Sequence, residues 1–393
     1  ILVTAASPLF NGNSDYTNFK DSRGIQLISS EYDHQKWERA RQACKEAIEF
    51  CDAELGGPGE RSLYTVNDYI APSKMTAETR LLNALNKVMT EKWNKELIWG
   101  DSRNDIQGFE RNKLITINQT TFRTAGANSQ HGPTLRTVEN YYTKNGLPID
   151  EDATWDYNNR YKLTTIPEDH KSYAVVGEQT AYLHLNREPR FYADVTYEGK
   201  SWHIQRSGYA DWGAYFSKGG AAYRDNTMHA RAGYLLYKFN NRSLLKEGSN
   251  PTDWGRPWIY FRLADFYLYY AEVCNEINPN DANIIKYLDL VRERAGIPGY
   301  KDLATKAAPY GKNIIGNQEL QREAIYRERI IEMLGEGNYY FDMHRWMRAG
   351  WSQDETTGKW IKDNEDKLLI RYGMDIDLSL IHISEPTRLL SIS

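Results

Sequence analysis

The sequence predicts a mainly α-helical protein with long loops and a few short β-strands. Apolar residues recur at three- and four-residue steps through about residues 1–100 and again through about 255–350, a spacing typical of amphipathic helices. Between these parts, short β-prone runs alternate with Gly, Asn and other turn residues. We therefore expect a helical scaffold formed by the two outer parts and a loop- and strand-rich part at about 100–250.

Two helices are predicted in the N-terminal part. The first spans residues 33–53, where Trp37 begins an apolar stripe and the GGPG at 56–59 ends the helix. The second spans about 76–99 and opens on TAE, which is typical of a capped start. These two helices could pair as an antiparallel hairpin.

Four β-prone runs follow: LITI at 114–117, YAVV at 173–176, RFYADVTYEG at 190–199 and GYLLYKF at 233–239. In the third run, apolar or aromatic residues alternate with others, as expected of a strand with one covered face. From 201 to 231 the composition turns to Gly, Ser, Asp and aromatics, which predicts a long ordered loop of the kind that carries function.

The last third is predicted to be helical again. The expected helices span residues 259–277, 281 to the AGIPG at 295–299, and 317–334. Gly296 stands in the C-cap position of the second helix. Helix pairs of this length with short turns are similar to tetratricopeptide-like hairpins, although no 34-residue repeat is visible.

Composition and charge exclude several classes of protein. With 393 residues and 40% hydrophobic residues, the chain is long enough for one large or two ordinary globular domains. Its 49 basic and 53 acidic residues give a net charge of −4, and no Lys/Arg cluster marks a nucleic-acid interface. The sequence has no run of about 18 apolar residues to span a membrane, and its three cysteines do not make a disulfide framework.

The sequence contains no recognised catalytic motif, so we expect no catalytic residue, no metal and no cofactor. It lacks a nucleophile elbow, a phosphate-binding glycine loop, a dinucleotide fingerprint and an HExxH zinc motif. The eight histidines are scattered, and none has a second His or a Cys at metal-ligand spacing.

The densest group of candidate catalytic side chains lies in AIYRERIIEMLGEGNYYFDMHRWM, at residues 324–347. The side chains that could form an acid/base set there are Glu332, Glu336, Asp342 and His344. A structural interpretation explains more of the pattern: Gly335 and Gly337 end one helix with positive φ, and Asp342 caps the turn that follows. We favour the structural interpretation.

Exposed aromatic side chains are the best candidates for a binding site, because the C–H face of a sugar ring lies well on an aromatic face. The main cluster, in the 201–231 loop, consists of Trp202, Tyr209, Trp212, Tyr215 and Tyr223, with Asp211, Arg206 and Arg224 to hydrogen-bond hydroxyls. Within it we predict Trp212 and Tyr215 as the stacking platform.

Two further aromatic clusters are candidates. The second consists of Trp155, Tyr157 and Asn158, and the third consists of Trp99, Asp101 and Arg103. Other aromatics fall on helical apolar stripes and are assigned to the core: Trp37, Trp93, Tyr267, Tyr270 and Trp346.

Both ends of the sequence are unusual. The chain begins ILVTAASPLF, without an initiator Met or a signal peptide, and we expect that N-terminal residues are missing. From residue 378 onward, LSLIHISEPTR resembles the conceptual translation of a transposase adapter used in sequencing libraries. We expect a single domain at 1–377 and an adapter-derived tail at 378–393.

Several segments resemble, in order, the SusD/RagB family of outer-membrane nutrient-binding lipoproteins. They include YDHQKWERARQACKEAIE, YYTKNGLPIDED, NREPRFYADVTYEGKSW, FRLADFYLYYAEVCNEI and REAIYRERIIEMLGEGNYYFDMHRWMRAG. The similarity covers essentially residues 1–377. The resemblance implies four tetratricopeptide-like helix pairs, with RERIIE as part of the scaffold and the ligand site built from loops; it assigns no binding residue by motif.

The resemblance also implies a non-catalytic binder. Such proteins are lipid-anchored at the cell surface, cover a SusC-like TonB-dependent transporter, and capture glycans or sometimes peptides for import. The export signal, the lipid-bearing Cys and the first helices of the family are not in this sequence. Starch, pectin, mucin O-glycan, host N-glycan and peptide are all compatible with loops of this composition.

Two other functions stay open. A helical-repeat adaptor would bind protein partners through a concave face, and the aromatic loop at 201–231 would then be incidental. A glycoside hydrolase would need two carboxyl groups about 5 to 10 Å apart beside the aromatics.

Overall fold

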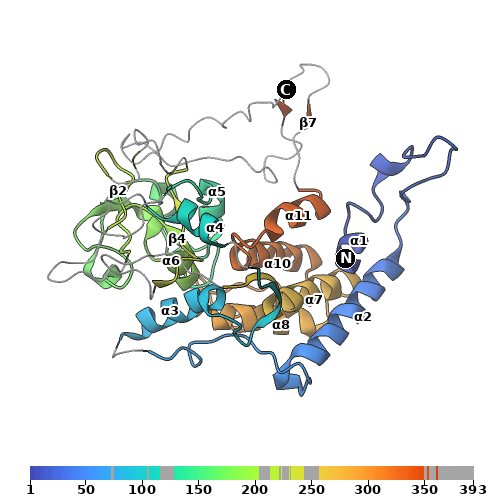
Figure 1. Ribbon diagram of the computed structural model, residues 1–393, viewed down its shortest axis with the longest axis horizontal. Helices are drawn as coiled ribbons and strands as arrows, with labels where there is room; N and C mark the ends of the chain where they lie inside the picture. Colours follow the sequence, from blue (N-terminus) through green and yellow to red (C-terminus); the bar gives the residue numbers. More distant parts are fainter. Residues whose placement is uncertain are drawn as a thin grey trace. The chain divides into compact units, whose positions relative to one another are not determined.

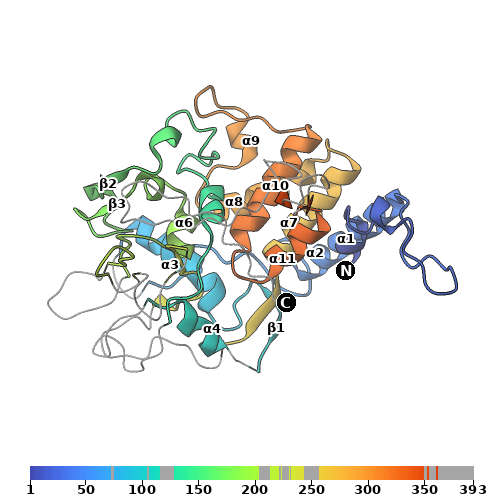
Figure 2. The same cartoon turned by 90° about the horizontal axis from the view of Figure 1, so that it is seen from above.

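The structure is a computed structural model (Figures 1 and 2). It describes residues 1–71, 75–103, 106–115, 128–202, 213–220, 223, 230, 232–242, 256–348, 352–353 and 360–361. Two compact units make up the chain. The first contains the described residues within Ile1–Ser62, Leu263–Leu290 and Asn313–Ile370, and the second contains those within Leu63–Arg262 and Val291–Lys312.

The first unit is helical in its described part, apart from one short strand pair. Its α-helices are α1 (Leu2–Ala6), α2 (His34–Cys51), α7 (Leu263–Ile277), α10 (Gln318–Glu332), α11 (Asn338–Arg345) and the start of α8 (Ala282–Arg294). The 3-10 helices η1 (Ser14–Tyr16) and η2 (Ala53–Leu55) and the strands β7 (Ser352–Gln353) and β8 (Trp360–Ile361) complete it. α7 packs against both α2 and α10, so it lies at the centre of this unit.

The second unit combines short helices with two-stranded antiparallel ribbons. Its helices are α3 (Ala77–Thr90), α4 (Ile106–Lys113), α5 (Leu135–Asn140), α6 (Pro189–Asp194), α9 (Tyr300–Leu303), η3 (Tyr157–Asn159), η4 (Glu168–His170) and η5 (Tyr182–His184). Its strand pairs are β1 (Leu97–Asp101) with β6 (Trp258–Arg262), β2 (Leu163–Thr165) with β3 (Gln179–Ala181), and β4 (Val195–Thr196) with β5 (Leu235–Leu236). Within the described residues the fold is mainly helical, as predicted.

Helix α2 forms where the apolar periodicity predicts it. Asp33 caps its start, because its carboxylate accepts a hydrogen bond from the Gln35 backbone N–H at 2.8 Å. The buried stripe of the helix consists of Trp37, Ala40, Cys44, Ile48 and Cys51. The predicted hairpin with the next helix is wrong: α2 packs against α7 and α1, whereas α3 packs against α6.

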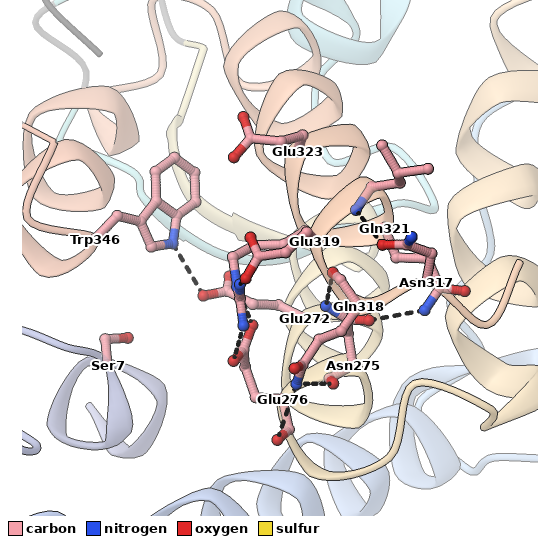
Figure 3. Close-up of polar contacts among 12 residues, drawn as sticks. Ser7, Glu272, Asn275, Glu276, Asn317, Gln318, Glu319, Gln321, Glu323 and Trp346 are labelled. Atoms are coloured by element: carbon pink, nitrogen blue, oxygen red, sulfur yellow. Dashed lines mark hydrogen bonds and ion pairs between the residues drawn. The ribbon is translucent and has the colours of Figure 1, made fainter. Parts of the chain in front are cut away.

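Side chains of α7 and α10 exchange hydrogen bonds, as Figure 3 shows. The Asn275 side chain donates to the Gln318 carbonyl at 3.0 Å, and the Gln318 side chain donates to the Asn275 carbonyl at 2.9 Å. Gln321 donates from Nε2 to Asn275 Oδ1 at 2.8 Å. These reciprocal bonds satisfy polar groups between the helices and fix their register.

Buried ion pairs tie α11 to α7. Arg345 donates from Nη2 to Glu272 Oε2 at 2.7 Å and from Nε to Asp342 Oδ1 at 2.8 Å. The indole N–H of Trp346 donates to Glu272 Oε1 at 2.9 Å (Figure 3). Because all four side chains are buried, the charges compensate one another inside the helical unit.

The predicted capping role of Asp342 is wrong. Helix α11 starts after Gly337, whose φ is +95°, and Asp342 lies inside the helix, where it accepts a hydrogen bond from Arg329 Nε at 3.0 Å. The predicted positive φ is confirmed at both Gly335 and Gly337. The charged side chains Asp342, Arg329 and Arg345 hold helices together, which supports the structural interpretation of residues 324–347.

Three predictions in the second unit are wrong. Residues 190–194 form α6 and not a strand, because Pro189 stands in the first helical turn, where proline favours a helix; the strand β4 begins at Val195. YAVV at 173–176 contributes an isolated bridge at Ala174 and no strand. The second predicted helix ends at Thr90 and not at 99.

The early end of α3 changes the environment of Trp93. This residue has φ +52° and its side chain is 58% exposed, so the helical stripe does not extend to it and its assignment to the core is wrong. The other aromatics assigned to the core, Trp37, Tyr267, Tyr270 and Trp346, are buried. Among the described helices, none is long and apolar enough to cross a membrane.

Candidate functional site

The predicted platform in the 201–231 loop lies largely outside the described residues. This applies to Arg206, Tyr209, Asp211, Trp212 and Arg224. Of the remaining members, Tyr215 is half-buried and Tyr223 is partly exposed. Burial and the neighbouring Glu178 raise the pKa of the Tyr215 phenol, which therefore stays protonated and can act as a hydrogen-bond donor.

Trp202 does not offer a stacking face. Its side chain is 0% exposed, and its ring meets Tyr237 edge-on with centroids 5.2 Å apart. It belongs to a core cluster with Leu114, Phe216 and Leu235. The expectation that Trp202 binds a ligand is corrected by this burial, because both ring faces pack against protein.

In the second aromatic cluster only Trp155 is internal, whereas Tyr157 and Asn158 are exposed. Trp155 is buried and donates its indole N–H to the Leu185 carbonyl at 3.0 Å, which corrects its assignment as a ligand-binding residue. Tyr157 is 36% exposed, but the guanidinium of Arg160 lies 3.9 Å from its ring centroid and 4.1 Å from that of Tyr161. One face of Tyr157 is thus already occupied by a cation–π contact.

The third cluster lies on a surface ribbon formed by β1 and β6 (Figure 2). Trp99 on β1 is 58% exposed, and Tyr260 and Phe261 on β6 are 42% and 39% exposed. The centroid of the Trp99 ring lies 4.8 Å from Tyr260 and 5.8 Å from Phe261, the latter nearly parallel at 18°. We call these three residues the aromatic platform.

The register of the ribbon explains why consecutive aromatics are exposed. Trp99 pairs with Phe261, but Gly100 pairs with Ile259, so Tyr260 is an extra residue on β6. A bulge of this kind interrupts the alternation of side chains between the two faces. As a result Tyr260 and Phe261 are both exposed, while Ile259 is buried.

Glu96 holds together the end of the ribbon at which β1 begins and β6 ends. Its carboxylate accepts hydrogen bonds from Arg262 Nη1 at 2.6 Å, from Arg294 Nη1 at 3.0 Å and from the Tyr64 backbone N–H at 2.9 Å. At the end of the ribbon Arg262 pairs with Leu97. Leu97 directly follows Glu96 in the chain. The buried carboxylate therefore joins the first residue of β1 to the last of β6.

An ion pair borders the platform where β1 ends. Arg103 donates from Nη2 to Asp101 Oδ2 at 2.6 Å and from Nε to both carboxylate oxygens at 3.0 Å. The hydrogen bonds from the Arg103 side chain and backbone lower the pKa of Asp101 to about 2. Asp101 is therefore ionised at neutral pH and cannot serve as a general acid there.

Gly100 lets the two strands approach each other closely. A Cβ atom at this position would lie 2.9 Å from the Trp258 carbonyl oxygen, a backbone atom that cannot move away without separating the strands. We expect Gly100→Ala to lower the free energy of unfolding by about 1–3 kcal/mol through overpacking. Urea denaturation, monitored by circular dichroism, measures this change in the free energy of unfolding.

Gly108 in α4 provides the matched control. A Cβ atom there meets nothing within 4 Å, so Gly108→Ala should raise helix stability by roughly 0.5–1 kcal/mol. Equal effects of the two substitutions would contradict the close approach at Gly100.

Sequence reasoning identified Trp99, Asp101 and Arg103 but missed Tyr260 and Phe261. These two residues were included in the helix predicted at 259–277, whereas the helix α7 starts at Leu263. The β-prone run WIYF directly after Pro257 is the signal that favours a strand. Among the described residues, no group of three or more His, Cys, Asp or Glu side chains could hold a metal ion.

Comparison with known proteins identifies the family. The sequence model of the SusD family matches residues 95–375. The chain belongs to the SusD family. This confirms the resemblance derived from the ordered sequence segments.

Individual members of the SusD family are similar over different lengths. SusD-like protein P25 of Formosa agariphila is 43% identical over 88 residues, which are 22% of this chain and 15% of that protein. The solved structure of BT4246 is 27% identical with a TM-score of 0.69, covering 88% of this chain and 58% of its own. A SusD-like protein of Bacteroides fragilis, BF3747, shares the fold at 19% identity and a TM-score of 0.51, covering 83% and 56%. This chain thus spans less than two thirds of each of these relatives.

Proposed function

We propose that this SusD-family protein captures glycans at the cell surface without catalysis and delivers them to a SusC-like TonB-dependent transporter in the outer membrane. Family membership supports glycan binding as the general function. Lipid anchoring and the transporter partner are inferred from the same membership. The ligand-binding residues are proposed from the geometry of the second unit.

The exposed aromatic platform carries the proposal. The ring of Trp99 contacts the rings of both Tyr260 and Phe261, and each of the three side chains is more than a third exposed. Together they form a surface of the type on which the C–H face of a sugar ring lies. Asp101 and Arg103 supply acceptors and donors for hydroxyl groups at its edge.

The charge state of Asp101 excludes it as the general acid of a glycosidase. A glycosidase needs a carboxylic acid that remains protonated near its working pH, and such an acid has a raised pKa. The pKa of Asp101 is instead lowered to about 2 by its bonds to Arg103. The exposed rings of the ribbon support a binder, and membership of the SusD family favours a sugar ligand over the adaptor function.

Replacing Trp99 by alanine tests the proposal. In calorimetric titrations against a panel of soluble neutral polysaccharides, we expect the wild-type protein to bind at least one and Trp99→Ala to bind it about 30-fold more weakly. This figure corresponds to about 2 kcal/mol for truncating an aromatic anchor of a binding surface.

Trp93→Ala is the matched control, since Trp93 is also 58% exposed and lies outside the ribbon. It should leave the affinity unchanged. Unchanged polysaccharide binding by Trp99→Ala would contradict this site. A wild-type protein that binds peptides and no polysaccharide would contradict this function.

A further inference from the structure

The ion pair beside the aromatic platform uses much of the hydrogen-bonding capacity of the Asp101 carboxylate but only two of the N–H groups of the Arg103 guanidinium. The Asp101 carboxylate accepts from Arg103 Nε, Nη2 and backbone N–H, the last at 2.9 Å. The Asp101 side chain is 20% exposed, whereas that of Arg103 is 87% exposed. The guanidinium therefore faces solvent with a carboxylate fixed along one edge.

The pair is close to the platform in space as well as in sequence. Asp101 follows Trp99 by two residues on the same strand and pairs with Trp258 of β6. The pKa of Arg103 is raised chiefly by its hydrogen bond to Asp101, and the nearby Tyr260 phenol adds a smaller electrostatic contribution. A sugar lying on Trp99 and Tyr260 is thus within the electrostatic reach of both charges.

The charges of Asp101 and Arg103 cancel over the whole pH range in which the protein can be studied. Because the pKa of Asp101 is about 2, its carboxylate is ionised above about pH 3, and the guanidinium is always protonated. A neutral hydroxyl gains from both partners, as it can donate to the carboxylate or accept from the guanidinium. An anionic group gains little net attraction from a compensated pair, because the repulsion by the carboxylate offsets the attraction by the exposed guanidinium.

We propose that the Asp101–Arg103 pair makes the platform selective for neutral sugars over uronic-acid or sulfated ones. Asp101 is the specificity-determining residue, because it cancels the positive charge that would otherwise attract an anionic glycan. This inference rests on the proposed glycan-binding function and adds the chemical class of the ligand.

The test compares a neutral polysaccharide with its own carboxymethylated derivative, so that the two ligands differ in charge. For the wild-type protein we expect about threefold tighter binding of the neutral polymer at low ionic strength, because only its hydroxyl groups gain from both partners of the pair. Asp101→Asn keeps the side-chain size and leaves Arg103 uncompensated. We expect this variant to reduce the preference for the neutral polymer about fivefold or more, an effect that 0.5 M salt should largely remove.

A second variant makes the test independent of any change in the turn at Asp101. Arg103→Gln leaves the carboxylate uncompensated and should increase the preference for the neutral polymer, in the opposite direction to Asp101→Asn. Wild-type preference for the carboxymethylated polymer, or an unchanged preference in both variants, would overturn the inference while leaving glycan capture intact. Failure of the wild-type protein to bind any polysaccharide, neutral or anionic, would overturn the proposed function itself and this inference with it.

Discussion

Glu96→Gln is expected to lower the free energy of unfolding by about 3–5 kcal/mol, the usual cost of removing one partner from a buried charge cluster. The substitution preserves the size of the side chain but removes the negative charge that faces Arg262 and Arg294. All three side chains are at most 3% exposed, so water cannot solvate the two arginine charges that lose their partner. The base of the β1–β6 ribbon should therefore loosen.

Urea denaturation and polysaccharide binding together measure this effect. We expect a lower midpoint with an unchanged slope, because the fold is retained while its stability falls. Binding should weaken as well, since Glu96 holds the strands that carry Trp99 and Phe261.

Glu91→Gln is the matched control for Glu96→Gln. Glu91 is exposed and accepts a hydrogen bond from the Tyr64 hydroxyl at 2.8 Å, whereas Glu96 accepts from the backbone of the same tyrosine. Its replacement should cost about 1 kcal/mol or less. Similar midpoints for the two variants would contradict the role assigned to the buried charges.

Arg345→Met is expected to destabilise the first unit by a similar amount, about 3–5 kcal/mol. Burial by itself lowers the pKa of Arg345, but Glu272 and Asp342 outweigh burial and raise it, so the guanidinium is charged and compensated. Without it, the buried side chains of Glu272 and Asp342 lose a partner whose nitrogens lie 2.7 and 2.8 Å from their oxygens. Thermal and urea denaturation should both show the loss.

Arg348→Met offers a comparison three residues along the chain. Arg348 pairs with Glu323, whose side chain is 56% exposed, so solvent screens this pair. We expect a loss of about 0–1 kcal/mol. A larger effect for Arg348 than for Arg345 would show that burial does not decide the strength of these pairs.

Local patterns predicted the helices well and the ribbon poorly. The start of α2 depends on Asp33, and its buried stripe repeats within the helix, so both are visible in a short window. The pairing of Trp99 with Phe261 joins strands about 160 residues apart, and no local pattern reports it. The aromatic run at 258–270 fits the spacing of a helix as well as a strand, and the family resemblance does not fix its boundary.

Residue type alone did not separate exposed tryptophans from buried ones. Trp202 lies in a Gly- and Ser-rich sequence that favours a loop, yet it is enclosed by the core, whereas Trp93 lies on a predicted helical stripe and is exposed. Exposure depends on where an element ends and what packs on it, as the end of α3 at Thr90 illustrates. Trp99 was identified because it stands beside charged residues at the end of a predicted helix.

Hydroxyl-radical footprinting with and without a bound polysaccharide tests most directly whether the platform is the ligand site. Oxidation of each aromatic side chain reports its exposure, and Trp93 and Trp99 start from the same exposed fraction of 58%. We expect the ligand to protect Trp99, Tyr260 and Phe261 and to leave Trp93 unchanged. Protection of Tyr157 or Trp93 with unchanged oxidation of Trp99 would show that the glycan binds elsewhere.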